Sequence, residues 1–400
     1  MPRRPLRHGN TDDQMRTLLF HSRGHRRGVL TVAGLVALGG ISLAACAESS
    51  NEAPTTPDSS VIAPSEDATA DAASDADADA ADAAIVLPDV PCAVGNVCHV
   101  PTTLTVGSFS ALAGRSNSDV WAAGSLGLMI HWDGHVWTDI RSTEVPKDLS
   151  TMTGLSLSAD WAYGVAGPIV MRRGLSPDSV HKIDTFIPYA FTSIVFLDNG
   201  HGYIGASEGS LAPPGTGGLL IELVDFDGVG LMALPPPVVA ANNAPMPMNI
   251  QALFAVPGNA LWAVGQRGTI AHYPLAEADA GPGEGMVLPL ANQNNLFAAW
   301  GQGDQLWAVG EAGTVIHIDG TTATEEASGT TTTLNAVFGF SKSDIWAAGD
   351  SGTLLHFDGK TWSRIPIQGY SGKLRTIWGA SPDDVWIGGE GAMFHWGPLP

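Results

Sequence analysis

The sequence predicts an all-β protein whose main domain is a β-propeller of seven four-stranded sheets. Two observations lead to this prediction. One pattern recurs from residue 104 to the end of the chain about every 40 residues, a period typical of propeller blades. Glycine and proline are abundant, at 48 and 27 of 400 residues, whereas only 15% of residues are charged. This composition favours short strands and turns over long helices.

An aromatic residue marks each copy of the repeat. The copies lie 40, 42, 59, 45, 39 and 40 residues apart, and their anchors are Trp121, Trp161, Tyr203, Trp262, Trp307, Trp346 and Trp386. A glycine lies three residues after each tryptophan anchor, and a second glycine follows shortly after it. Five copies then carry a histidine on the expected third strand: His131, His272, His317, His356 and His395.

Each copy has the pattern of four antiparallel strands. In the clearest copy, residues 334–365, short apolar runs alternate with turns such as Gly349–Gly352 and Asp358–Gly359. The strand that contains Trp346 is apolar or small on both faces, so both faces must be covered. A propeller blade between two neighbouring blades meets that demand.

The number and closure of the blades are less strongly determined. Six or eight blades remain alternatives, because the copy anchored by Tyr203 is irregular. The last copy ends after its third strand, so we expect a segment near Ile85–Val90 or Leu104–Val106 to complete it and close the ring. The irregular insertions Ser207–Gly218, Pro235–Pro247 and Leu275–Gly285 are candidate functional loops.

The N-terminal segment, residues 1–45, has the pattern of a bacterial export signal. Arg26 and Arg27 precede an apolar run from Val29 to Ala45 that contains no charged residue. The run ends in Leu43-Ala-Ala-Cys46, which resembles the lipobox of bacterial lipoproteins and implies that Cys46 is lipidated. Met15 is an alternative start, and the arginine pair leaves a twin-arginine signal open beside the general secretory one.

Residues 46–84 form an acidic linker rich in alanine and aspartate. Such a stretch cannot bury enough apolar surface to offset the entropy cost of ordering, so we expect a disordered tether to the propeller at 85–400. Asp75, Asp77 and Asp79 have the spacing of a calcium loop, but Ala80 and Val86 occupy its glycine and glutamate positions. Beyond Cys46 the chain carries 12 basic and 38 acidic residues, which argues against nucleic acid as a partner.

The chain has three cysteines, Cys46, Cys92 and Cys98. If Cys46 carries lipid, the other two form an even pair that suits a disulfide in an oxidising compartment. A zinc site is disfavoured, because a tetrahedral site needs about four ligands and only His99 lies next to the two cysteines.

The repeat also resembles known families. The segments Asp133-Gly134-His-Val-Trp137 and Asp358-Gly359-Lys-Thr-Trp362 are similar to repeats of Asp-box (BNR, kelch-like) and photosystem II assembly factor-like propellers, and the whole chain resembles bacterial propeller lipoproteins. The resemblance implies a propeller fold and a lipid anchor in the cell envelope, in the outer membrane because Ala47 and not aspartate follows Cys46.

The repeated histidines and tryptophans are interpreted as structural. Each histidine is expected to bond a neighbouring turn, with Asp119, Asp344 and Asp384 as candidate partners, and the indoles are expected to pack between blades. A ring of metal-binding imidazoles is the weaker alternative. We therefore expect no cofactor and no metal.

Binding or scaffolding of a protein or glycan is the function that the sequence favours, by a monomer at the periplasmic or outer cell surface. A sialidase-like glycosidase is one alternative, but it needs paired carboxylates, and the seven arginines beyond Cys46 recur at no common blade position. No Ser-His-Asp, phosphate-loop or HExxH motif is present, so no catalytic residue is assigned. An assembly factor for a membrane complex is the second alternative.

Overall fold

The structure, a computed structural model, describes the residues 87–102, 107–140, 152–158, 161–167, 169–174, 180–184, 189–197, 202–208, 219–224, 230–233, 249–256, 259–275 and 285–399. All of them belong to one compact unit, 76–400. The expected signal segment 1–45, Cys46 and the tether 46–84 lie outside the described residues. Most of the three candidate loop insertions also lies outside them.

The strands pair into four-stranded antiparallel sheets, and seven such sheets occur in the described residues. The first sheet contains β2 (Phe109–Ser116), β3 (Asp119–Gly124), β4 (Met129–Trp132) and β5 (Trp137–Asp139). The second contains β6 (Gly154–Leu157), β7 (Ala162–Ala166), β8 (Ile169–Arg173) and β9 (Val180–Asp184). The third contains β10 (Tyr189–Phe196), β11 (Gly202–Glu208), β12 (Leu219–Val224) and β13 (Gly230–Ala233).

The remaining sheets follow in chain order. The fourth contains β14 (Ile250–Val256), β15 (Ala260–Gly265), β16 (Ile270–Pro274) and β17 (Met286–Leu288). The fifth contains β18 (Leu296–Gln302), β19 (Gln305–Gly310), β20 (Val315–Asp319) and β21 (Thr322–Glu326). The sixth contains β22 (Leu334–Ser341), β23 (Asp344–Gly349), β24 (Thr353–Phe357) and β25 (Trp362–Ile365). The seventh contains β26 (Leu374–Ser381), β27 (Asp384–Gly389), β28 (Met393–Trp396) and β1 (Val97–His99).

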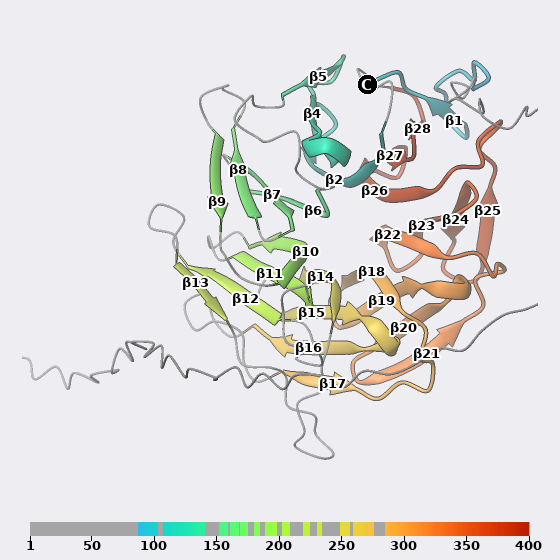
Figure 1. Cartoon of the computed structure of the whole chain (residues 1–400). Coiled ribbons are helices and arrows are strands. Elements are labelled where there is room, and N and C mark those ends of the chain that lie inside the picture. The colour runs from blue at the N-terminus through green and yellow to red at the C-terminus, as the bar shows by residue number, and fades with distance from the viewer. Residues whose placement is uncertain are drawn as a thin grey trace, which may run out of the picture. The chain divides into compact units, whose positions relative to one another are not determined.

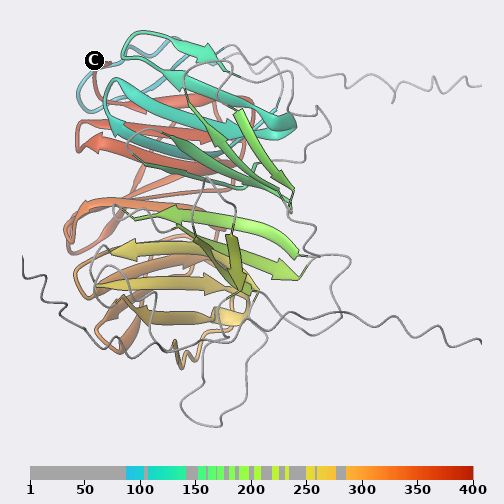
Figure 2. The same ribbon diagram turned by 90° about the vertical axis from the view of Figure 1, so that its left-hand side faces the viewer.

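The first strands of the sheets surround a common axis. Each contacts the first strand of the next sheet, in the cyclic order β2, β6, β10, β14, β18, β22, β26 and back to β2. Figure 1 shows the sheets fanning out around this centre, and Figure 2 shows their strands running between two faces. The prediction of an all-β propeller is therefore confirmed.

Hydrophobic clusters fill the space between neighbouring sheets. One cluster joins Trp346 and Ala348 of the sixth sheet to Leu374 and Val385 of the seventh. The second strands, such as β23 and β27, are buried on both faces, as the continuous apolar pattern predicts. The anchors Trp121, Trp262, Trp307, Trp346 and Trp386 all lie in these buried second strands, each at 3% exposure or less.

The seventh sheet is closed by a different segment from the one expected. Its outer strand is β1, Val97–His99, which pairs with β28 so that Cys98 lies opposite His395. The expectation for Ile85–Val90 was wrong, because its described part, 87–90, forms no strand, and Leu104–Val106 lies outside the described residues. A disulfide between Cys92 and Cys98 folds the chain back beside β28, and a loop of this size contributes about 2 kcal/mol.

The anchor of the second copy is also corrected. Trp161 precedes β7, and Tyr163 takes the tryptophan position, because Tyr163 pairs with Arg172 as Trp121 pairs with His131. Trp161 and Tyr163 lie two residues apart and so point to the same side of an extended chain. The repeat pattern alone favours Trp161, because Gly164 lies three residues after it, so only the strand pairing identifies Tyr163.

The turns between second and third strands explain the second repeated glycine. Leu126, Arg267, Ala312 and Ser351 all have φ between 54° and 58°, and the glycine after each has a positive φ as well. Two consecutive left-handed residues define a type I′ hairpin turn. At Gly313 an added Cβ would lie 2.0 Å from the carbonyl oxygen of Thr330, so only glycine fits there.

Candidate functional site

The repeated histidines lie beside carboxylates of their own sheets. His131 Nε2 lies 2.8 Å from Asp119 Oδ1, and His356 Nε2 lies 2.8 Å from Asp344 Oδ1. Each aspartate begins the second strand and each histidine lies on the third, so the bond ties two neighbouring strands together. The imidazoles also pack against the anchor indoles, with ring centroids 4.9 Å apart for His131 and Trp121.

Asp119 is the most connected of these carboxylates. Burial raises its pKa, but hydrogen bonds from Arg115, His131 and Trp121 outweigh burial and bring the pKa below its usual value. Arg115 also donates to the carbonyl oxygen of Ser158 in the second sheet. Asp119 therefore stays ionised and holds Arg115, whose bond to Ser158 links the first two sheets.

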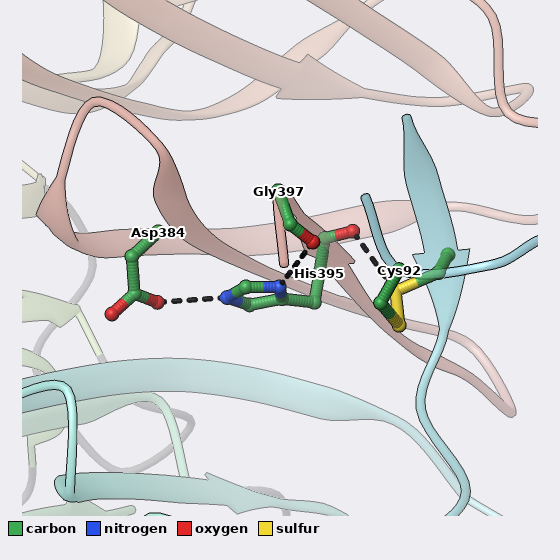
Figure 3. Close-up of a disulfide and its surroundings, with 5 residues drawn as sticks. Cys92, Asp384, His395 and Gly397 are labelled. Carbon is green, nitrogen blue, oxygen red and sulfur yellow. Dashed lines mark hydrogen bonds and ion pairs between the residues drawn. A yellow bond between two sulfur atoms is a disulfide. The ribbon is translucent and has the colours of Figure 1, made fainter. Parts of the chain in front are cut away.

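The seventh sheet contains the most enclosed pair. His395 is fully buried, and its Nε2 lies 2.7 Å from Asp384 Oδ1 while its Nδ1 lies 3.2 Å from the carbonyl oxygen of Gly397. Cys98 Sγ lies 3.4 Å from the carbonyl oxygen of the same histidine. Figure 3 shows the imidazole between Asp384 and the disulfide of Cys92. This arrangement joins the two ends of the propeller chain.

The other copies depart from the aspartate–histidine pattern. In the fifth sheet His317 Nδ1 lies 3.2 Å from Glu326 Oε1, on the fourth strand of that sheet. In the fourth sheet burial lowers the pKa of His272. In the third sheet Tyr203 pairs with Glu222, and burial together with that carboxylate raises the pKa of Tyr203 to about 12. The five histidines therefore lie in separate sheets, each against its own neighbours. Among the described residues, no group of three or more His, Cys, Asp or Glu side chains is placed to hold a metal ion.

The two Asp-Gly turns are local caps. Asp133 Oδ1 accepts from the backbone N–H groups of Val136 and His135, and Asp358 Oδ1 accepts in the same way from Thr361 and Lys360. These bonds lower the pKa of both carboxyl groups. These bonds fix the turn between the third and fourth strands, and Trp137 and Trp362 follow this turn at the start of the fourth strand.

A second set of polar residues recurs on one face of the propeller. All sheets have the same strand order, so all first strands begin at one face, which we call the first-strand face. Here, in five of the seven sheets, the residue after the glycine that follows the anchor contacts a polar side chain at the start of the first strand. The pairs are Ser108–Ser125 (2.9 Å), Asn249–Gln266 (2.9 Å), Asn295–Glu311 (2.8 Å), Asn335–Asp350 (2.8 Å) and Arg375–Glu390 (2.7 Å).

The charge on the first-strand face is uneven. The fifth, sixth and seventh sheets carry Glu311, Asp350 and Glu390 in these pairs, whereas the first and fourth carry the neutral Ser125 and Gln266. Lys373 lies 3.5 Å from Asp350 Oδ2, and Arg375 is bonded to Glu390. We call Glu311, Asp350 and Glu390 the charged arc. The side chains of Arg375 and Glu390 are 39% and 42% exposed, so the arc is open to solvent in the seventh sheet.

Sequence reasoning missed this arc. The polar residue directly after the first repeated glycine was available as a signal, since it recurs with the same period in five copies. Its partner lies at the start of the first strand, 15 to 17 residues away in the chain, and only the hairpin pairing brings the two together.

The fold and this arc define a class of protein, a β-propeller with a charged, solvent-open arc on one face. The described part of the chain contains no helix with the length and apolarity that a membrane span requires. No protein-family model and no curated protein matches the sequence.

Solved propeller structures do resemble the chain. A structure of YCF48 bound to D1 peptide has a TM-score of 0.57 at 16% identity and covers 79% of this chain and 99% of its own. YCF48 from Cyanidioschyzon merolae gives 0.58 at 16% identity over 76% and 99%. The extracellular domain of the putative one-component system BT4673 from B. thetaiotaomicron gives 0.57 at 12% identity over 75% of this chain and 39% of its own. These similarities show the propeller fold.

Proposed function

We propose that this protein is a binding or scaffolding propeller of the cell envelope, held by lipid on Cys46, that recognises a protein or glycan on its first-strand face without catalysing a reaction. The observation that carries the proposal is the charged arc of Glu311, Asp350 and Glu390. The arc stands on a rigid ring of paired strands, which suits recognition. The similar YCF48 structure is bound to a D1 peptide, which supports a polypeptide ligand.

The remaining parts of the proposal come from the sequence. Residues 1–45 serve as the export signal, and residues 46–84 are a disordered tether between the lipid and the propeller. Diacylation at Cys46 together with an N-acyl group gives stable anchoring, since a single acyl chain binds membranes only marginally. The Cys92–Cys98 disulfide fits an oxidising compartment outside the cytoplasm. The protein acts as a monomer.

The ligand-binding face is tested by charge neutralisation. The protein is cross-linked to its neighbours in the cell envelope, and the amount of captured partner is measured. For the triple variant Glu311→Gln, Asp350→Asn, Glu390→Gln this amount is expected to fall about tenfold, because complementary charge is removed at the contact. The matched control Asp304→Asn, Asp319→Asn, Asp383→Asn removes three exposed charges at the opposite strand ends, and it is expected to capture as much partner as the wild type. Equal retention by both variants, with unchanged thermal unfolding midpoints, would contradict the proposed face.

The anchor is tested separately. The variant Cys46→Ser cannot form the thioether to the diacylglyceride, so it is expected to be released from washed membranes or to accumulate with its signal segment uncleaved. Membrane fractionation and the mass of the mature N-terminus measure this. Full membrane retention of a correctly processed Cys46→Ser protein would exclude lipid anchoring at this residue.

A further inference from the structure

An exposed leucine lies on the first-strand face. Among the described residues four large hydrophobic side chains are exposed: Val94, Leu126, Val136 and Leu399. Val94 precedes β1, Leu399 follows β28 and Val136 precedes β5, so these three lie at the opposite strand ends. Leu126 is the one of the four that lies on the first-strand face, in the turn between β3 and β4, and it is 62% exposed.

The backbone of Leu126 has an unfavourable conformation for a leucine. Its φ of 58° and ψ of 36° are left-handed, as the first central position of a type I′ turn requires. The amide of Leu128 donates to the carbonyl oxygen of Ser125 at 3.1 Å and so holds this turn. Glycine adopts the left-handed conformation freely, whereas the Cβ of a leucine makes it costly. We therefore expect glycine at position 126 to stabilise the turn.

Packing inside the protein does not offset this cost. Leu126 belongs to none of the hydrophobic clusters that the described residues form. Leu128, two residues further on, is fully buried in the cluster between the seventh and first sheets. Strained residues persist mainly where they serve a function, and an exposed apolar side chain on a binding face is suited to a contact with another molecule.

The turn that carries Leu126 adjoins the charged arc. Ser108, at the start of the first sheet, forms an isolated β-bridge with Glu390 of the seventh sheet. The hydroxyl of Ser108 lies 2.9 Å from the hydroxyl of Ser125, and Leu126 is the next residue. The leucine therefore continues the arc from the seventh sheet onto the first, on the same face.

We propose that Leu126 is the apolar anchor of the first-strand face, and that its partner is a polypeptide that packs an apolar side chain against it beside the charged arc. The inference rests on the proposed function, because it selects polypeptide over glycan as the ligand of that face. Leucine offers no hydrogen-bonding group, so covering it with an apolar side chain is favourable. The hydroxyl groups of a glycan would lose hydrogen bonds to water there.

The test uses formaldehyde cross-linking of the full chain in isolated cell envelopes and measures the amount of captured protein. Leu126→Gly is expected to lower this amount about fivefold, because the apolar contact is lost. Its thermal unfolding midpoint is expected to equal or exceed that of the wild type, because glycine fits the left-handed turn. A protein that binds less without becoming less stable is the result that distinguishes an anchor from a structural residue.

Ala312→Gly is the matched control. Ala312 occupies the same turn position in the fifth sheet with φ 54°, so glycine relieves the same backbone strain there without removing a large side chain. This variant is expected to capture as much partner as the wild type. Leu126→Met keeps an unbranched apolar side chain at the turn and is expected to retain most of the capture.

Three results would overturn the inference. The first is wild-type capture by Leu126→Gly; if the arc triple variant still captures about tenfold less, this inference fails and the proposed function stands. The second is a lower unfolding midpoint for Leu126→Gly that Ala312→Gly does not share, because Leu126 would then support the fold. The third is loss of capture after glycosidase treatment of the envelopes, which would assign the face to a glycan. Absence of any captured partner for the wild type would instead contradict the proposed function itself.

Discussion

Trp386→Ala is expected to lower the free energy of unfolding by about 4 kcal/mol. Trp386 is fully buried between the seventh and first sheets. Its ring lies 5.0 Å from Trp132 and 5.1 Å from Trp137, centroid to centroid, so its removal leaves a large cavity where the ring of sheets closes. Denaturant titration followed by tryptophan fluorescence and circular dichroism measures the loss.

Trp386→Phe provides the matched control. The indole N–H of Trp386 has no hydrogen-bond partner in the structure, so phenylalanine removes no bond and keeps most of the buried ring. We expect less than half of the loss seen with alanine. A Trp386→Ala protein as stable as the phenylalanine variant would show that this residue does not join the sheets as described.

Asp384→Ala is expected to destabilise the protein by about 3 kcal/mol, because it leaves His395 buried without its carboxylate. The two ring nitrogens of His395 face two acceptors, Asp384 Oδ1 and the carbonyl oxygen of Gly397. Asp384 and the carbonyl of Gly397 therefore hold the imidazole between them, and Gly397 belongs to the C-terminal segment after β28.

Asp344→Ala is the matched comparison, because Asp344 makes the same bond to His356 in the sixth sheet. The His356 side chain is 30% exposed, against 0% for His395, so water can replace the lost carboxylate. We expect a loss of about 1 kcal/mol or less. Equal losses in the two variants, measured by the same denaturant titration, would show that burial does not set the strength of these pairs.

Much of the fold was predictable because the repeat encodes local hairpins. The Trp–Gly–His pattern locates the second and third strands, and five of the six tryptophan anchors lie where it predicts. Tyr163 and the closing strand Val97–His99 were not predictable in the same way. Tyr163 shares its side of the strand with Trp161, and β1 is a three-residue strand whose place depends on pairing with β28 at the far end of the chain.

The candidate site was harder to predict than the fold. The aspartate partners of His131, His356 and His395 lie 11 or 12 residues before them in the same copy, so the repeat itself indicates them. The arc around Asp350 and Glu390 depends instead on which copies carry a charged residue and which carry a neutral one at that place. That choice differs from copy to copy, so a periodic pattern does not contain it.

Hydrogen exchange of the closing strand tests the central claim, that β1 and β28 join the two ends of the chain into one ring. The Val100 amide donates to the carbonyl oxygen of Met393 at 2.8 Å, and Cys98 lies opposite His395. With the disulfide intact, peptides covering 97–100 and 393–396 are expected to exchange as slowly as those from β23 and β24. Exchange of 97–100 at the rate of an unfolded chain, while β23 and β24 stay protected, would contradict the closed ring.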